Sequence, residues 1–219
     1  MSLETKTCKN QGRGFAGDDR DQLIEELKKA LAAEKKQNVY LKRVASVYRQ
    51  AALVDQLTGL LNRRAFDQYS ERLFGLLPGA DDKRKSVIPC IGLCMIDVDH
   101  FKLINDRHGH PIGDVVLKEV AGRVRQSLRT SDLVFRYGGE EIAVLLPGVS
   151  PEESTVVAEK VRQNVVHDVQ STPVTISIGV TCATRYVHPT SMVRAADEAL
   201  YAAKNSGRNC VATKMLKQR

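Results

Sequence analysis

The sequence lacks any long hydrophobic run. Within its 219 residues, no apolar stretch approaches the roughly 20 residues that a helix needs to cross a bilayer. Residues 1–20 also lack the apolar segment of a secretory signal peptide. We therefore expect no membrane span and a cytoplasmic location.

The sequence also lacks a block of basic residues. Its 33 Lys and Arg exceed its 26 Asp and Glu to give a net charge of +7, but this surplus is spread along the chain. A nucleic-acid-binding surface usually shows as clustered Lys and Arg. We therefore expect no nucleic acid partner, whereas phosphorylated small molecules are compatible with the charge.

Cysteine is scarce and odd in number. The five cysteines lie mostly in apolar runs, which is typical of reduced thiols that pack like small hydrophobic groups; they are Cys8, Cys90, Cys94, Cys182 and Cys210. No second pair follows Cys90 and Cys94, which argues against a zinc site. Reduced thiols fit the cytoplasm.

What remains is a chain that can bury a core. Hydrophobic residues make up 42% and charged residues 27%, as in ordinary globular proteins. The length suits one sizeable domain with an appendage. We predict a disordered lead at residues 1–18, a helical stalk at 19–56 and a folded domain at 57–219.

The stalk segment is uninterrupted by Gly or Pro, and its apolar residues follow a heptad spacing that Glu34 and Gln37 break. This pattern is typical of a weak coiled coil. Two interpretations remain open. The helix is either a connector that lies on the globular domain, or a stalk that dimerises or docks a regulatory partner helix.

The remaining pattern alternates helices with strands. Helices are expected at 57–77, in two pieces around Gly109 and Gly113 that end near Leu128, and at 151–168 and 190–204. Strands are expected at 87–98, 133–137, 141–146, 174–182 and 210–215. This order predicts an α+β fold with one mostly antiparallel sheet and helices on one face.

Acidic residues follow the most apolar strand. Alternation along a strand points Asp97 and Asp99 to the same face. A Gly-Gly turn carries Glu140 and Glu141 on the tip of a neighbouring hairpin. Three or four acids that converge there would need a divalent cation to neutralise them. The alternatives are a solvated strand end and an ordinary hairpin turn.

Several ordered motifs resemble a known family. Phe135-Arg-Tyr-Gly-Gly-Glu-Glu-Ile, Asp97-Val-Asp-His-Phe-Lys, Asp55-Gln-Leu-Thr-Gly and the late Lys204-Asn-Ser-Gly-Arg stretch are similar to signatures of the GGDEF domain of diguanylate cyclases. The resemblance covers about residues 55–215 and implies a palm-like nucleotide-cyclase fold, its central mostly antiparallel sheet flanked by helices and preceded by the long N-terminal helix. Ile142 departs from the family, which usually has Phe there.

The resemblance implies the condensation of two GTP into cyclic di-GMP with release of two pyrophosphates. Asp97, Glu140 and the carbonyl of Val98 would hold Mg²⁺, or Mn²⁺, with Glu140 as the base and Asp99 and Glu141 in support. The residues implied to bind substrate are Lys102 over the phosphates, Asn105 and Asp114 on guanine, His110 as a further contact, and Lys204 with Arg208 on the terminal phosphates.

A feedback site is implied as well. Arg129 and Asp132 stand at the spacing of the family's inhibitory product site, five residues before Gly138. Arginine can bind guanine through two parallel hydrogen bonds. The alternative is a capping pair at a corner between a helix and a strand.

One protomer would hold one GTP, so the resemblance implies an enzyme that works as a homodimer or higher assembly. Two rivals differ in class. A catalytically silent domain would bind GTP or cyclic di-GMP and signal to a protein partner through residues 19–56, whereas a structural adaptor would bind no nucleotide.

Overall fold

The structure is a computed structural model that describes residues 17–79, 88–169 and 172–216. It divides into two compact units, residues 1–51 and 52–219. The first contains helix α1, Gly17–Ala51. Most of the expected disordered lead, together with Cys8, lies outside the described residues. None of the described helices is long and apolar enough to span a membrane.

Helix α1 ends before the expected position near Gln56. Beyond Ala51 the chain forms a turn, which an isolated bridge between Val54 and Leu61 closes. The Asp55 carboxylate accepts hydrogen bonds from the backbone and hydroxyl of Thr58, at 2.9 and 2.7 Å. Gly59 has a φ of 71°. Such a side-chain bond competes with helix, and a positive φ interrupts it.

The second helix is likewise shorter than the expected 57–77. A short strand β1, Leu61–Asn62, precedes helix α2, Arg63–Phe74. Asn62 caps α2 by accepting a hydrogen bond from the Ala65 amide at 3.1 Å.

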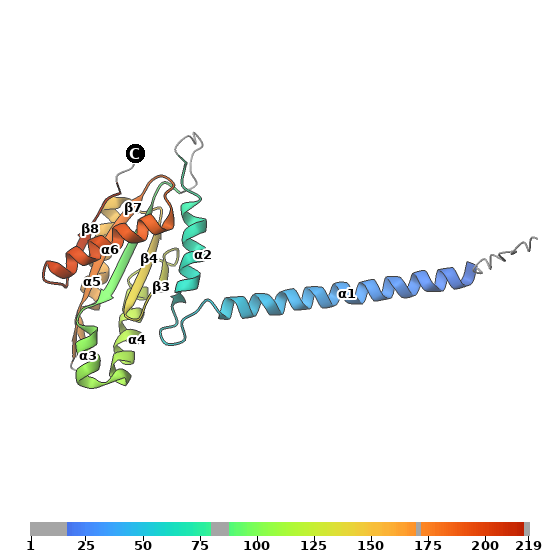
Figure 1. Cartoon of the computed structure of the whole chain (residues 1–219), viewed down its shortest axis with the longest axis horizontal. Coiled ribbons are helices and arrows are strands. Elements are labelled where there is room, and N and C mark those ends of the chain that lie inside the picture. The colour runs from blue at the N-terminus through green and yellow to red at the C-terminus, as the bar shows by residue number, and fades with distance from the viewer. Residues whose placement is uncertain (1–16, 80–87, 170–171, 217–219) are drawn as a thin grey trace, which may run out of the picture. The chain divides into compact units, whose positions relative to one another are not determined.

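The centre of the domain is a six-stranded sheet in the order β1-β3-β4-β2-β7-β8 (Figure 1). Pairs β2–β4, β2–β7 and β3–β4 are antiparallel, whereas β1–β3 and β7–β8 are parallel. The expected mostly antiparallel sheet is confirmed. Its further strands are β2 Ile91–Val98, β3 Leu133–Arg136, β4 Glu141–Pro147, β7 Ile176–Ala183 and β8 Val211–Thr213.

Helices cover both faces of this sheet, so the expectation of helices on one face is wrong. One apolar cluster joins the sheet to the side of α3, α4 and α5, and a second joins it to α2 and α6. All eight residues of β2 are buried, because a central strand between two helical layers has no solvent-facing side. The helices are α3 Phe101–His108, α4 His110–Gln126, α5 Pro151–Val165 and α6 Pro189–Asn205.

One element was not expected. Helix α5 ends at Val165 rather than near 168, and β5 His167–Val169 pairs with β6 Thr172–Val174 in a separate two-stranded sheet. The start of α5 follows the sequence signal, because Ser150 and Glu153 form a reciprocal capping box.

Candidate active site

Strand register brings the end of β2 together with the base of the β3–β4 hairpin. Asp97 stands directly opposite Glu141 on β4 and opposite Ser177 on β7. Residues paired in this way point to the same face of the sheet. That face is the one that α6 covers, since Met95, two residues before Asp97, packs in the α2–α6 cluster.

Asp97 is a buried acid with a cationic partner. The residue is 7% exposed, and Lys204 at the end of α6 places its Nζ 2.8 Å from Asp97 Oδ2. Burial raises the pKa of Asp97, an effect that Lys204 and Arg208 oppose and Asp99 increases. Burial destabilises the charged form of such a carboxylate, and a nearby cation stabilises it, so Asp97 is suited to bind a cation.

The hairpin tip adds two partly exposed acids, Glu140 and Glu141. Burial, followed by repulsion from Asp97 and Asp197, raises the pKa of Glu141. Glu140 lies on the tip itself and is partly exposed. A Cβ on Gly138 would overlap the Glu141 carboxylate and would push that side chain aside. The Gly-Gly spacing therefore lets Glu141 fold back under the tip.

An arginine that the sequence analysis did not single out supports the tip. Arg136 donates from Nε and Nη2 to the carbonyl of Gly139, at 3.1 and 2.8 Å. Its Nη1 donates to both oxygens of Asp55, at 3.1 and 3.2 Å. Although burial raises the pKa of Asp55, hydrogen bonds from Thr58 and Arg136 hold it below its usual value. Arg136 and Asp55 both lie in the motifs that resemble the GGDEF family, and this was the sequence signal that could have identified them.

Asp99 departs from the expected acid cluster. Its carboxylate accepts hydrogen bonds from the hydroxyls of Thr175 and Ser177 and from the backbone of Asn209. These bonds occupy both oxygens of Asp99, and its expected role in support of Glu140 stays a prediction. Within the described ranges, no three carboxylate, imidazole or thiol groups gather closely enough to form a metal site by themselves.

The expected guanine-binding residues lie on α3 and α4, which break at Gly109 with a φ of 81°. Asn105 is partly buried, and its Oδ1 is buried without a hydrogen bond from any described residue. A Cβ on Gly113 would collide with that oxygen, so a glycine at this contact allows the two helices to approach. The remaining candidates, Lys102, His110 and Asp114, are exposed.

The Arg129–Asp132 corner is organised as a turn. The buried Asp132 carboxylate accepts the Arg129 amide at 2.8 Å. Arg125 donates to the carbonyls of Asp132 and Arg129, at 2.7 and 3.0 Å. The Arg129 side chain is exposed. Asp132 thus has the capping contact of the alternative reading, while the arginine remains open to solvent.

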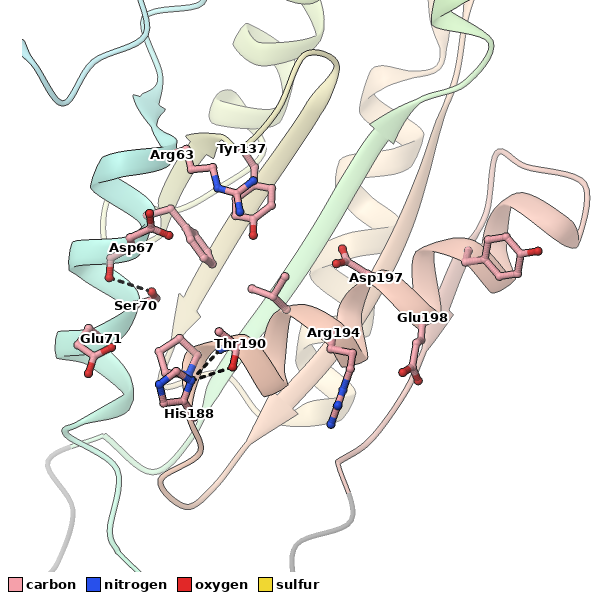
Figure 2. Close-up of a pocket in the computed structure, with 14 residues that line it drawn as sticks. Arg63, Asp67, Ser70, Glu71, Tyr137, His188, Thr190, Arg194, Asp197 and Glu198 are labelled. Atoms are coloured by element: carbon pink, nitrogen blue, oxygen red, sulfur yellow. Dashed lines mark hydrogen bonds between the residues drawn. The ribbon is translucent and has the colours of Figure 1, made fainter.

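A hollow of about 580 Å³ lies between α2 and α6, where Tyr137 at the end of β3 also lines it (Figure 2). Arg63 stacks over the ring of Tyr137 with its guanidinium carbon 4.0 Å from the ring centroid. Phe66 meets the same ring edge-on at 5.0 Å. Because Tyr137 directly precedes Gly138, these contacts brace the hairpin from the side of α2.

The chain is similar in sequence to known proteins. The family model "Diguanylate cyclase, GGDEF domain" matches residues 52–210. Response regulator PleD of Caulobacter vibrioides is 39% identical over 173 residues, which cover 75% of this chain and 37% of PleD. Diguanylate cyclase DgcP of Pseudomonas aeruginosa is 39% identical over 166 residues, 74% of this chain and 24% of DgcP.

The fold also matches solved structures. The coiled coil and GGDEF domain of DgcB from Caulobacter crescentus, in complex with c-di-GMP, gives a TM-score of 0.71 at 30% identity and covers 85% of this chain and 98% of that one. Diguanylate cyclase SiaD of Pseudomonas aeruginosa, in complex with its activator SiaC, gives 0.68 at 31% identity, with 90% and 75% covered.

The fold and the hairpin site define a nucleotide-cyclase-like α+β domain with a GGEE signature. The chain belongs to the GGDEF-domain family of diguanylate cyclases. It spans between about a quarter and a half of the length of the curated relatives that it matches.

Proposed function

We propose that this chain condenses two molecules of GTP into cyclic di-GMP and releases two pyrophosphates. The observation that carries the proposal is the Asp97–Lys204 pair, 2.8 Å long, at a strand end that directly faces Glu141 and the Gly138-Gly139-Glu140 tip. A carboxylate, a cation and a partly exposed acid at one edge suit phosphate chemistry on a nucleoside triphosphate.

The acids fit a divalent cation. Asp97 and Glu141 are like charges in register, both with raised pKa values, and hard cations such as Mg²⁺ prefer oxygen ligands. Asp97, Glu140 and the carbonyl of Val98 would hold the ion, Mg²⁺ first and Mn²⁺ as a substitute. When bound, it would offset the repulsion between the triphosphate and an incoming hydroxyl.

The protein groups then have separate tasks. Glu140, a partly exposed acid on the hairpin tip, takes the proton from the 3′-hydroxyl. Lys204 and Arg208 hold the terminal phosphates, and Lys102 stabilises charge that builds up on the transferred phosphate. Asn105 and Asp114 read the guanine edge, and His110 makes a further substrate contact.

Two sites must meet for the reaction, so the active form is a homodimer or a higher assembly. Helix α1 is a suitable element for this, since its heptad residues Leu27 and Leu41 are 60% and 53% exposed. The likeness to SiaD, solved with its activator SiaC, supports regulation by a protein partner, and α1 is the element that we propose this partner binds. Product bound at Arg129 and Asp132 would provide feedback.

The rival proposal is a silent binding domain. The presence of Asp97, Glu140 and Lys102 favours the enzyme, since a domain that only binds nucleotide has no need of a base.

The four described cysteines are free thiols, in keeping with the reducing cytoplasm.

One experiment separates these functions. Purified protein is incubated with GTP and Mg²⁺, and the nucleotides are resolved by chromatography. Conversion to cyclic di-GMP supports the proposal. GTP binding without conversion would indicate the silent domain, and no binding would indicate a structural adaptor. Specific activity that falls on dilution, more steeply for a chain that starts at Ala52, would support assembly through α1.

A further inference from the structure

A buried and fully hydrogen-bonded acid at the end of β2 has no task in the proposed chemistry. Asp99 follows the last residue of β2 and is 4% exposed. Its Oδ1 accepts the Ser177 hydroxyl at 2.6 Å, and its Oδ2 accepts the Thr175 hydroxyl at 2.7 Å and the Asn209 amide at 3.0 Å. Its own amide donates to the carbonyl of Thr175 at 2.9 Å.

These bonds distinguish Asp99 from its neighbour Asp97. A metal ion would need a carboxylate oxygen at about 2.0–2.6 Å. At Asp99 both oxygens already accept short hydrogen bonds, and a cation would strand the Ser177 and Thr175 hydroxyls in a buried place. At Asp97 the side chain has one partner among the residues that the structure describes, Lys204, which contacts one oxygen. The Asp99 carboxylate therefore binds groups of the protein itself, and it is less suited than Asp97 to bind a metal ion.

The protein segment that Asp99 holds is a left-handed turn. Gly207, Arg208 and Asn209 have φ values of 109°, 64° and 44°. Only glycine adopts this region freely, and two consecutive residues with a Cβ require outside support. Asp99 supplies it at the Asn209 amide, and Arg162 supplies more by donating to Asn209 Oδ1 at 2.6 Å.

The turn also lies next to the two cationic side chains that are proposed to bind phosphate, Lys204 and Arg208. It follows the end of α6, where Lys204 reaches Asp97. Arg208 lies in the turn itself, and its amide closes the helix end on the Ala203 carbonyl at 3.2 Å. The buried Asp99 carboxylate at the end of β2 fixes this turn. The turn then sets the orientation of the Arg208 backbone.

We propose that Asp99 is a positioning residue for the phosphate-binding end of the site. Through the Asn209 amide it fixes the left-handed turn and so places Arg208 beside Lys204, which sets the preference for a nucleoside triphosphate over a monophosphate. This inference rests on the proposed function for the identity of the ligand, but the anchoring of the turn stands on the hydrogen bonds alone.

The test compares Asp99→Asn with Asp67→Asn, which makes the same change at an exposed position on α2. Amide hydrogen exchange is measured without nucleotide or metal. We expect exchange across residues 206–210 to rise about tenfold in Asp99→Asn, because a charge-assisted bond is lost, and to stay unchanged in Asp67→Asn. Unaltered exchange in both variants would overturn the proposal.

Ligand affinity gives the second measurement. In the Glu140→Gln background, which should not consume GTP, Asp99→Asn should weaken GTP binding about tenfold and leave GMP binding unchanged. Equal weakening of both nucleotides would overturn the positioning role. A Mn²⁺ titration, followed by electron paramagnetic resonance, tests the alternative role. If Asp99→Asn lost Mn²⁺ affinity while amide exchange of the turn stayed normal, Asp99 would be a metal ligand instead.

Two further variants protect the test against misfolding. Ser177→Ala and Thr175→Val leave Asp99 in place and remove one donor each, and each should raise exchange of the turn by a smaller, about threefold, factor. If the parent protein bound no GTP, the proposed function would fail, while the exchange measurement would still decide whether Asp99 anchors the turn.

Discussion

The two ends of the candidate site differ in how far their own residues satisfy one another. At the sheet end, Asp97 pairs with Lys204, and the Arg136 guanidinium holds both Asp55 and the hairpin tip. At the helix end, Asn105 Oδ1 is buried without a described hydrogen-bond partner. Lys102 is exposed there and belongs to no ion pair among the described residues.

For the charged groups, the difference between the two ends follows from burial. A charge that is removed from water must be paired, or the fold does not tolerate it. The sheet end lies between packed layers, so its acids and cations are positioned by folding itself. The exposed groups of α3 and α4 remain hydrated at little cost and depend on a ligand for order. Most of the catalytic geometry should therefore lie at the sheet end, and the selectivity for the guanine base at the helix end.

The largest effect is expected from Glu140→Gln. The amide keeps the shape of the side chain but cannot take a proton, so product formation should fall about a thousandfold or more. Stability should hardly change, because Glu140 sits partly exposed on a hairpin tip. Product is measured by chromatography and stability by thermal unfolding. Glu152→Gln, an exposed change on α5, is the control, and full activity of Glu140→Gln would remove Glu140 from the mechanism.

The next effect compares the same substitution at both ends. Lys204→Met removes the partner of buried Asp97 and should cost about 1–2 kcal/mol of unfolding free energy, less than for a fully buried pair because the Lys204 side chain is 32% exposed. Lys102→Met should stay within about 0.5 kcal/mol.

Urea unfolding of both lysine variants provides the measurement. Activity should fall in each, since both lysines are proposed to contact phosphates. If the two variants lost equal stability, the contrast between a pre-paired sheet end and an open helix end would not hold.

A smaller effect concerns pH. The pKa of Asp55 lies below its usual value, so its charge stabilises the fold above the unfolded pKa of about 4, and this contribution disappears as pH falls through the folded pKa. Asp55→Asn should cost about 1 kcal/mol at pH 7 and progressively less in acid. Unfolding free energies at pH 7 and pH 3 test this, with Asp67→Asn as the control. A pH-independent difference would contradict the role of the charge.

Much of the sheet end could be predicted from sequence, and for a physical reason. The run from Ile91 to Val98 is apolar because both faces are buried, so its terminal acid had to be functional or paired. The Gly138-Gly139 turn marked the hairpin by local chemistry alone.

The parts that escaped prediction depend on long-range contacts. The Arg136–Asp55 bond joins residues 81 positions apart, and the Asp99–Asn209 bond joins residues 110 apart. Strand spacing gave Asp97 and Asp99 the same face, but it could not show that Asp99 would turn to β7. The location of helices on both faces likewise depends on crossovers that periodicity does not report.

The smallest expected effect reverses the usual sign of a mutation. Asn105→Ala removes a buried carbonyl oxygen that no described residue satisfies and introduces a better helix former. The free domain should gain up to about 1 kcal/mol. Asn164→Ala is the matched change on α5, where the amide donates to the Ser127 hydroxyl at 2.8 Å, and it should lose stability. Urea unfolding measures both. If Asn105 reads guanine, its variant should also lose about tenfold of the preference for GTP over ATP, whereas Asn164→Ala should keep it. A loss of stability in Asn105→Ala would mean that its oxygen is already satisfied, and that the helix end is as completely paired as the sheet end.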